Sequence, residues 1–193
     1  LKEKGLTYDI NVGEGAFYGP KIDIKLKDAL KRKWQCATIQ CDFVLPKRFK
    51  LTYIDSDGKE KQPIMLHRVI LGSLERFIGA LLEHYNGELP LWLAPVQVRV
   101  IPIKDVICDY AIKVTKKLED NLIRAEIDNR NETLDKKIRN AELEKVPYIL
   151  VLGEREAKQD AVSVRKKGEG DKGSKKLEEF IKEIEEEIKN KVT

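Results

Sequence analysis

The spacing of apolar residues changes near residues 90–95, and this change limits the possible folds more than any other feature. Before it, residues 21–67 hold short segments of alternating apolar and polar side chains, which predict β-strands, and residues 71–85 have the spacing of an amphipathic helix. After it, segments with strand and helix spacing follow one another in turn. The sequence therefore predicts two domains, 1–92 and 93–193, an antiparallel α+β domain followed by an α/β domain.

The end of the second predicted domain is strongly polar. Residues 168–173 consist of glycine and charged residues, a composition that predicts a loop. Residues 175–191 carry apolar side chains at helical spacing among many charges, and they predict a helix with one buried face.

Composition excludes several classes of protein. The chain has 36% charged residues but a net charge of only +4, so charge alone does not indicate a nucleic-acid-binding protein. No run approaches the roughly 18 apolar residues that a membrane span needs. Cys36, Cys41 and Cys108 lack the C-x-x-C spacing of metal sites, so we expect reduced thiols in a cytoplasmic protein. The chain begins at Leu1 without a signal peptide, and we expect it to be a piece of a longer protein.

The predicted strand at 34–45 has an unusual distribution of polar residues. Alternation puts one set of mainly polar residues on one face: Trp34, Cys36, Thr38, Gln40 and Asp42. It puts the set predicted to be core on the other: Ala37, Ile39, Cys41 and Phe43. The polar face is either the solvent side of a sheet or the floor of a polar pocket. Amides and hydroxyls suit a pocket floor because they form hydrogen bonds without burying a charge.

The predicted helix at 71–85 contains two glycines beside an arginine. Gly72, Arg76 and Gly79 would share one helical face, and an interior glycine costs about 1 kcal/mol relative to alanine. Two such residues predict a close approach to the backbone, either by a packed sheet or by a planar ring stacked under the guanidinium. His67, just before this helix, is either a packed or surface residue or a metal ligand, and zinc would need further ligands.

Several segments together resemble one family. Residues 13–23, 34–43, 65–68, 72–76 and 92–98 are similar, in order, to segments of the threonyl-tRNA synthetase family of class II synthetases. The similarity spans essentially the whole chain, and sister class II enzymes such as the prolyl enzyme share the architecture. It implies the end of an antiparallel class II catalytic domain, followed by a small mixed-sheet α/β anticodon-binding domain.

The resemblance implies roles in the first domain. Lys21 and Arg76 match catalytic positions, and Arg76 would stack on adenine and counter phosphate charge. The implied threonine contacts are Tyr18, Cys36 and Gln40. The implied ATP contacts are Gln35, Thr38, Gly72, Ser73 and Arg76. His67 matches the third ligand of a catalytic zinc, which in the family binds the amino and hydroxyl groups of threonine and so rejects valine.

The resemblance also implies an RNA-binding surface in the second domain. The matching positions are Arg130, Asn131, Glu132, Arg139, Glu156 and Arg165. Such side chains read unpaired bases by hydrogen bonds, although each alone would be an ordinary surface residue. Lys145 stands where some relatives have arginine and Ala37 where some have glycine, which puts two contacts in doubt.

The implied activity is that of a threonine–tRNA ligase that uses ATP with magnesium, L-threonine, threonine tRNA and zinc, in a homodimeric parent protein. Motif 1, motif 2 and the first two zinc ligands are not found in the sequence, so this piece alone is expected to be inactive. Two alternatives stay open. One is a non-catalytic tRNA-binding module derived from a synthetase, and the other is a small-molecule enzyme that uses the α/β domain.

Overall fold

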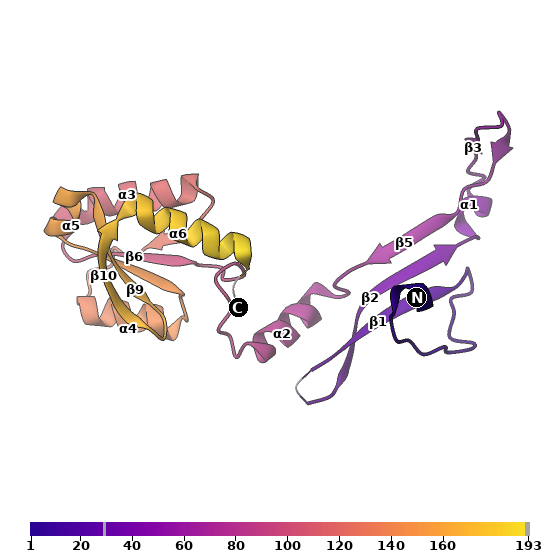
Figure 1. Cartoon of the computed structure of the whole chain (residues 1–193), viewed down its shortest axis with the longest axis horizontal. Helices are drawn as coiled ribbons and strands as arrows, with labels where there is room; N and C mark the ends of the chain where they lie inside the picture. Colours follow the sequence, from indigo (N-terminus) through magenta and orange to yellow (C-terminus); the bar gives the residue numbers. More distant parts are fainter. Residues whose placement is uncertain (29, 192–193) are drawn as a thin grey trace. The chain divides into compact units, whose positions relative to one another are not determined.

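The computed structural model describes residues 1–28 and 30–191. It divides into two compact units, Leu1–His84 and Tyr85–Thr193 (Figure 1). The division expected after residue 92 stays a prediction. Among the described residues, no helix is both long enough and apolar enough to cross a membrane.

The first unit is built on a three-stranded antiparallel sheet of order β1-β2-β5 (Figure 1). Its strands are β1 (Lys21–Lys27), β2 (Lys33–Asp42) and β5 (Met65–Val69). Its smaller elements are η1 (Lys2–Lys4), α1 (Leu45–Arg48), β3 (Tyr53–Ile54), β4 (Glu60–Lys61) and α2 (Leu74–His84). The register sets Lys21 beside Gln40 and Gln40 beside His67, so these three side chains form one row across the sheet.

The second unit is built on a five-stranded mixed sheet of order β10-β9-β8-β6-β7. Its strands are β6 (Val98–Pro102), β7 (Ala125–Ile127), β8 (Tyr148–Leu152), β9 (Ala161–Lys166) and β10 (Gly170–Lys176). Its helices are η2 (Asp105–Ile107), α3 (Cys108–Asp120), α4 (Leu134–Leu143), α5 (Glu154–Gln159) and α6 (Leu177–Asn190). Strands β7, β6 and β8 are parallel to one another, β9 is antiparallel to β8, and β10 is antiparallel to β9. This arrangement confirms the predicted mixed-sheet α/β fold.

Helices cover both faces of this second sheet (Figure 1). Apolar residues of α3 and α6, including Val114 and Phe180, pack with Leu150 of β8 in one cluster. Ala141 of α4 packs with Ile149 of β8 in a second cluster. Because the sheet is covered on both sides, its central strands are apolar on both faces, as in other parallel sheets.

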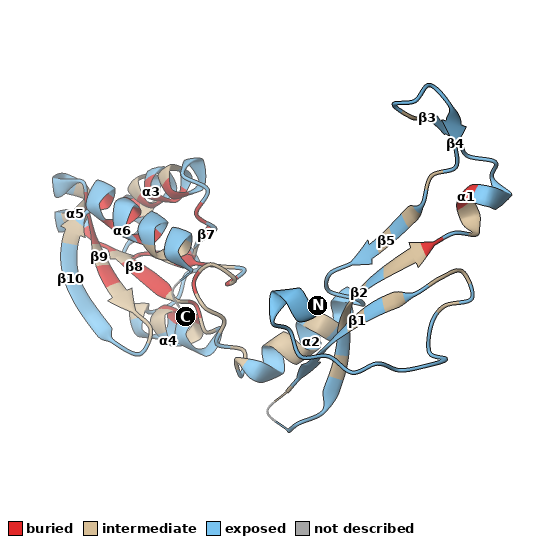
Figure 2. Ribbon diagram, turned by 45° about the vertical axis from the view of Figure 1, so that its right-hand side comes forward, coloured by how far each residue is buried: buried red, intermediate tan, exposed pale blue. Residues whose placement is uncertain are grey.

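The two units differ sharply in burial (Figure 2). Among the described residues of the first unit, only Asp42 and Pro46 are buried, whereas the second unit contains the apolar core. The prediction that Ile39 and Phe43 belong to a core is wrong, because they are 39% and 47% exposed. Alternation places Ile39 on the apolar side of β2, but no described residue of this unit forms a layer that buries it.

The segment that precedes β6 is bonded to the rest of the second unit. Gln97 is fully buried, and its amide donates to the carbonyl of Leu91 at 2.9 Å and accepts from the backbone of Arg124 at 2.9 Å. The Arg124 guanidinium donates to the carbonyls of Ala94 at 2.9 Å and Trp92 at 3.0 Å. These bonds replace the hydrogen bonds to water that the carbonyl groups would otherwise lose on burial. Residues 91–97 are therefore part of the second unit.

Candidate functional site

One carboxylate organises the polar face of the first sheet. Asp23 of β1 accepts hydrogen bonds from the Thr38 hydroxyl at 2.8 Å and the Gln35 amide at 3.0 Å, and it pairs with the Lys21 ammonium at 3.0 Å. Partial burial would raise the pKa of the Asp23 carboxyl, but the bonds from Lys21 and Thr38 hold it below its ordinary value. A charged carboxylate thus fixes three of the side chains that the sequence analysis singled out.

A bulge in β2 brings Gln35 to this face. Ile24 of β1 pairs with Ala37, but the next residue, Lys25, pairs with Gln35, so Cys36 is an extra residue in the ladder. Strict alternation would have put Gln35 on the opposite face from Thr38. The bulge lets both bond the same carboxylate, and no sequence period could have predicted it.

The polar face of the sheet continues towards the end of β2 at Asp42. The Tyr18 hydroxyl donates a hydrogen bond to the carbonyl oxygen of the Gln40 amide, and the ring of Tyr18 lies 6.0 Å from the imidazole of His67. His67 Nε2 lies 2.9 Å from Asp42 Oδ2. Thus Tyr18, Gln40 and His67 surround one end of the polar face.

Asp42 is the most buried residue of this region, with 1% of its surface exposed. Its Oδ1 accepts from the backbone of Val44 at 2.8 Å and Leu45 at 2.9 Å, while Oδ2 faces His67. Burial would raise the pKa of the Asp42 carboxyl, but these bonds hold it below its ordinary value. A charged acceptor therefore holds one ring nitrogen of His67.

These residues open onto a cavity of about 340 Å³. Its lining comprises Phe17, Tyr18, Gln40, Asp42, Val44, Leu45, Arg48 and His67. Aromatic and aliphatic walls with a few polar groups are typical of a small-molecule site. The described residues contain no group of three or more His, Cys, Asp or Glu side chains that could hold a metal. His67 is thus one candidate ligand where zinc needs three or four.

The start of α2 approaches the bulge through Gly72. This residue has a φ of 71°, and a Cβ on it would lie 2.9 Å from the carbonyl oxygen of Cys36. Gly72 lies before α2 rather than on a face of it, so the predicted shared face with Arg76 and Gly79 is wrong. A Cβ on Gly79 would meet nothing within 4 Å. Only the first glycine is explained by a close contact.

Ser73 and Arg76 form the first turn after this glycine. The Ser73 hydroxyl accepts from the backbone N–H of Arg76 at 3.4 Å and donates to Glu75 at 2.8 Å. This is the arrangement of a helix cap, which fixes where α2 begins. The Arg76 side chain is exposed, so its charge is available to a ligand.

In the second unit, the expected RNA contacts lie at two places. Arg130 and Asn131 follow β7, and Glu156 follows β8, so all three lie at the carboxyl edge of the parallel strands. Glu156 accepts from the backbone of Gly153 at 3.0 Å and thereby caps α5. Loops at this edge commonly carry binding residues in open α/β sheets.

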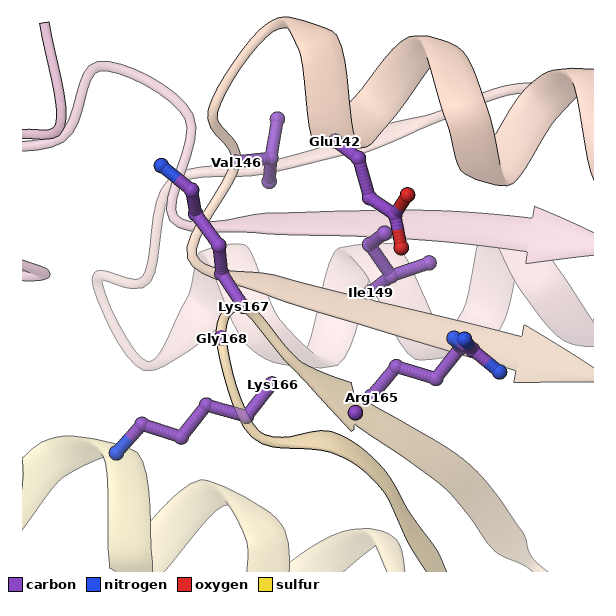
Figure 3. Close-up of a pocket in the computed structure, with 8 residues that line it drawn as sticks. Glu142, Val146, Ile149, Arg165, Lys166, Lys167 and Gly168 are labelled. Atoms are coloured by element: carbon purple, nitrogen blue, oxygen red, sulfur yellow. The ribbon is translucent and has the colours of Figure 1, made fainter.

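Arg139 and Arg165 lie along the face of the sheet that α4 covers. Arg139 is three residues from Glu142, so the two share a flank of α4, and Glu142 lines a cavity of about 250 Å³ with Arg165 (Figure 3). Arg165 is opposite Ile149 in the ladder between β8 and β9. Arg165 lines this cavity, whereas Arg139 is exposed on the flank of α4 that it shares with Glu142.

The neighbouring lysines point away from Arg165, as Figure 3 shows. Lys166 pairs with Glu187 and Glu169, each at 3.4 Å, and Lys167 pairs with Glu88 at 3.0 Å. The cavity is therefore not a convergence of three cations.

Three carboxylates went without a role in the sequence analysis. Asp23, Asp42 and Asp128 each stand two residues from a candidate: Lys21, Gln40 and Arg130. In a strand, a spacing of two puts side chains on one face, and that signal was available for Asp23 and Asp42 but not for Asp128, which follows β7. The carboxylates hold the candidates in place rather than facing a ligand themselves.

Both units match models of known protein families. A model of the tRNA synthetase class II core domain (G, H, P, S and T) matches residues 3–85, and a model of an anticodon binding domain matches residues 97–187. A threonine–tRNA ligase of Syntrophomonas wolfei is 57% identical over 192 residues, which are 100% of this chain and 30% of that protein. One of Clostridioides difficile is 55% identical over 191 residues, which are 99% of this chain and 30% of that protein.

Solved structures agree with these relatives. The RNA binding domain of threonyl-tRNA synthetase from Cryptosporidium parvum has a TM-score of 0.81 and 40% identity, and the match covers 96% of this chain and 47% of that one. A prolyl-tRNA synthetase from the same organism, complexed with L-proline and AMP, has a TM-score of 0.66 and 22% identity, with 93% and 39% covered. The second likeness concerns the fold alone.

Proposed function

Because the chain belongs to the threonine–tRNA ligase family, we propose that it supplies part of the catalytic site and the anticodon-binding domain of such a ligase. The chain spans about 30% of the length of the curated relatives it matches. In this proposal, residues 1–92 complete a catalytic domain and residues 93–193 bind RNA. The parent protein is a cytoplasmic homodimer, and the chain alone does not activate threonine.

The proposed reaction has two steps. A carboxylate oxygen of L-threonine attacks the α-phosphorus of ATP, and pyrophosphate leaves. The 3′-terminal hydroxyl of threonine tRNA then attacks the carbonyl carbon of the adenylate, and AMP leaves. Both steps build negative charge on oxygen, so fixed cations and hydrogen-bond donors lower their barriers.

The observation that carries the proposal is the hydrogen-bonded row on the first sheet. Tyr18 and Gln40 form one end of the row and would bind threonine, with Cys36 of the bulge as a further proposed contact. Lys21 stands at the other side of Gln40 and would face the adenylate phosphate. Gln35 and Thr38, held by Asp23, would contact the nucleotide. A site whose members are bonded in place before substrate arrives needs little reorganisation in the transition state.

Arg76 and His67 have proposed roles beside this row. Arg76, presented by Gly72 and Ser73, would stack on adenine and offset phosphate charge, as its exposure permits. His67 would be one ligand of a zinc ion whose other ligands lie outside the described residues. Magnesium would accompany ATP, whose phosphates it commonly binds.

In the second unit, the proposed RNA ligand is the anticodon loop of threonine tRNA. Its contacts would be Arg130, Asn131, Arg139, Glu156 and Arg165. Unpaired bases expose edges that such side chains can bind, and RNA-binding proteins read sequence mainly in such loops. The exposure of Arg130, Asn131 and Arg139 supports this assignment.

The test places this chain in a complete ligase. The chain replaces the matching segment of the Syntrophomonas wolfei enzyme, and threonine-dependent ATP–pyrophosphate exchange is measured. We expect exchange in this hybrid and none from the chain alone. Arg76→Ala should lower kcat/KM by about 100-fold, in the range for loss of one transition-state charge contact. Arg68→Ala is the matched control, because Arg68 is exposed and alternates to the opposite face of β5 from His67.

Other outcomes separate the remaining hypotheses. Normal exchange in Arg76→Ala would remove Arg76 from the catalytic site. A hybrid that binds tRNA but never exchanges would favour the non-catalytic tRNA-binding module, which the well-packed second unit also supports. Zinc content of His67→Ala, compared with His84→Ala, tests the metal role apart from activity.

A further inference from the structure

A buried carboxylate lies behind one of the proposed RNA contacts. Asp128 directly follows β7, and only 3% of its side chain is exposed. Its Oδ1 accepts from Nε of Arg130 at 2.8 Å and its Oδ2 accepts from Nη2 at 2.7 Å. The backbone N–H of Arg130 also reaches Oδ1, at 3.2 Å. The pairing is bidentate, so it fixes the plane of the guanidinium as well as its position.

The fixed guanidinium still presents donors to solvent. Arg130 has five N–H donors, of which Asp128 uses two, and 53% of the Arg130 side chain is exposed. The remaining edge carries one hydrogen on Nη1 and one on Nη2, side by side. That edge is the outer end of the group, because Asp128 occupies the edge that includes Nε.

Charge and burial indicate what this edge can bind. The hydrogen bonds from Arg130 hold the pKa of the Asp128 carboxyl below its ordinary value, so the pair is ionised and carries no net charge. A neutral pair attracts phosphate weakly, but it keeps its directional donors. Two adjacent donors fit two adjacent acceptors, and guanine offers such a pair at O6 and N7.

We propose that Asp128 is a positioning residue that holds Arg130 for end-on, bidentate recognition of a guanine base in the anticodon loop. This inference rests on the proposed function of the second unit and deepens it. Asp128 does not contact the RNA. It restricts the conformations of the Arg130 side chain before RNA binds, so less conformational entropy is lost on binding. It also determines which edge of the guanidinium is presented.

The experiment uses the whole chain and a fluorescent anticodon stem–loop of threonine tRNA with anticodon GGU, at one stated salt concentration. Two further loops each replace one guanine by adenine, which keeps N7 but exchanges the O6 acceptor for a donor. We expect one replacement to weaken binding by about 10-fold or more. Asp128→Asn should bring the ratio of the two affinities, for the loop with guanine over the loop with adenine, close to one. Asp135→Asn, in the exposed first turn of α4, should leave it unchanged.

A double-variant cycle separates positioning from a merely structural role. In an Arg130→Ala background, Asp128→Asn should change the ratio no further, because Asp128 acts only through Arg130. A further loss there, or a full ratio in Asp128→Asn alone, would overturn the inference. If the wild-type chain binds the three loops equally, this inference fails while the RNA-binding function stands. If it binds none of them, the proposed RNA-binding function fails as well.

A second variant covers the case in which Asp128→Asn does not fold. Arg130→Lys keeps the charge but lacks a planar pair of donors. It should lose discrimination while the dependence of affinity on salt stays as in the wild type, because the number of phosphate contacts is unchanged. Full discrimination by Arg130→Lys would overturn the inference.

Discussion

Gly72 is a residue at which the main chain must lack a side chain. Its φ of 71° is in the left-handed region, and a Cβ would lie 2.9 Å from the backbone oxygen of Cys36. That oxygen belongs to the bulge of β2 and cannot yield as a flexible side chain would. The same position begins the turn that presents Ser73 and Arg76. Both the packing of this segment against β2 and the presentation of Arg76 thus require that Gly72 has a hydrogen atom in place of a side chain.

Gly72→Ala should therefore destabilise the first unit by about 1–3 kcal/mol, through backbone strain and the clash with Cys36. Gly79→Ala, within α2, is the matched control. Because it meets nothing within 4 Å and has a helical backbone, it should stabilise α2 by about 1 kcal/mol. Urea unfolding followed by circular dichroism measures both. Equal effects of the two substitutions would contradict the explanation of Gly72.

The residues behind the candidate site show how far a sequence can be interpreted. Alternation correctly put Thr38, Gln40 and Asp42 on one face, but it wrongly put Trp34 there, because the bulge at Cys36 interrupts the period of two. It could not show that Asp42 would be buried and bonded to His67. That depends on which side chains converge after folding, and a highly charged sequence contains many other carboxylates that could accept a hydrogen bond from His67.

At the scale of elements, two strands departed from their sequence patterns for backbone reasons. Residues 168–173 were predicted to be a loop, but β10 covers Gly170–Lys176 and pairs with β9. An edge strand is held by main-chain hydrogen bonds and needs no apolar side chains, and charged residues there discourage pairing with other chains. The bulge at Cys36 likewise follows from ladder geometry. Helix α6 was predicted well, because it has a buried apolar stripe.

Helix α6 is attached to the sheet by a phenol as well as by its apolar face. The Tyr148 hydroxyl donates to Glu187 Oε2 at 2.6 Å, and the ring of Tyr148 lies 5.7 Å from that of Phe180. Burial, together with the bond to Glu187, raises the pKa of Tyr148 to about 12 from an ordinary value of 10.0. The folded state therefore holds this proton more tightly than the unfolded state.

The stability due to this proton should be complete below pH 10 and lost as the pH rises towards 12, because the unfolded phenol ionises first. Tyr148→Phe removes the titrating group, so its stability should fall less over that interval than the wild type's. It should also cost about 1 kcal/mol at neutral pH, from the lost hydrogen bond. Urea unfolding at pH 9 and pH 11 measures both effects. A parallel decline in the two proteins would exclude Tyr148 as the cause.

At the scale of the whole molecule, the two units differ in how they are stabilised. The second has central strands with fully buried residues, such as Val100 and Leu150. In the first, Asp42 and Pro46 are the only buried residues among those described, and its sheet leaves Ile22 and Leu66 44% and 65% exposed. Buried apolar area is the main source of folding free energy, so the second unit is the more stable.

Leu150→Ala should lower the free energy of unfolding of the second unit by about 2–5 kcal/mol, because it leaves a cavity in the centre of the sheet. Amide hydrogen exchange followed by mass spectrometry should then show faster exchange in β6, β8 and β9. Exchange in β1, β2 and β5 should be unchanged, and already faster than in the second sheet. Coupled acceleration in both units would show that they unfold as one.

The bonds around Gln97 have a consequence for how such proteins can be rearranged during evolution. Leu91 and Ala94 are buried, and Arg124 donates to the carbonyls of Trp92 and Ala94. Residues 91–94 nevertheless precede β6, the first strand of the sheet. A recombination event that joins the second unit to a new neighbour at residue 96 would leave Gln97 and Arg124 without their acceptors. A crossover at residues 85–88 would carry the whole set along. Heritable shuffling of this unit should therefore tolerate breakpoints only ahead of Leu91.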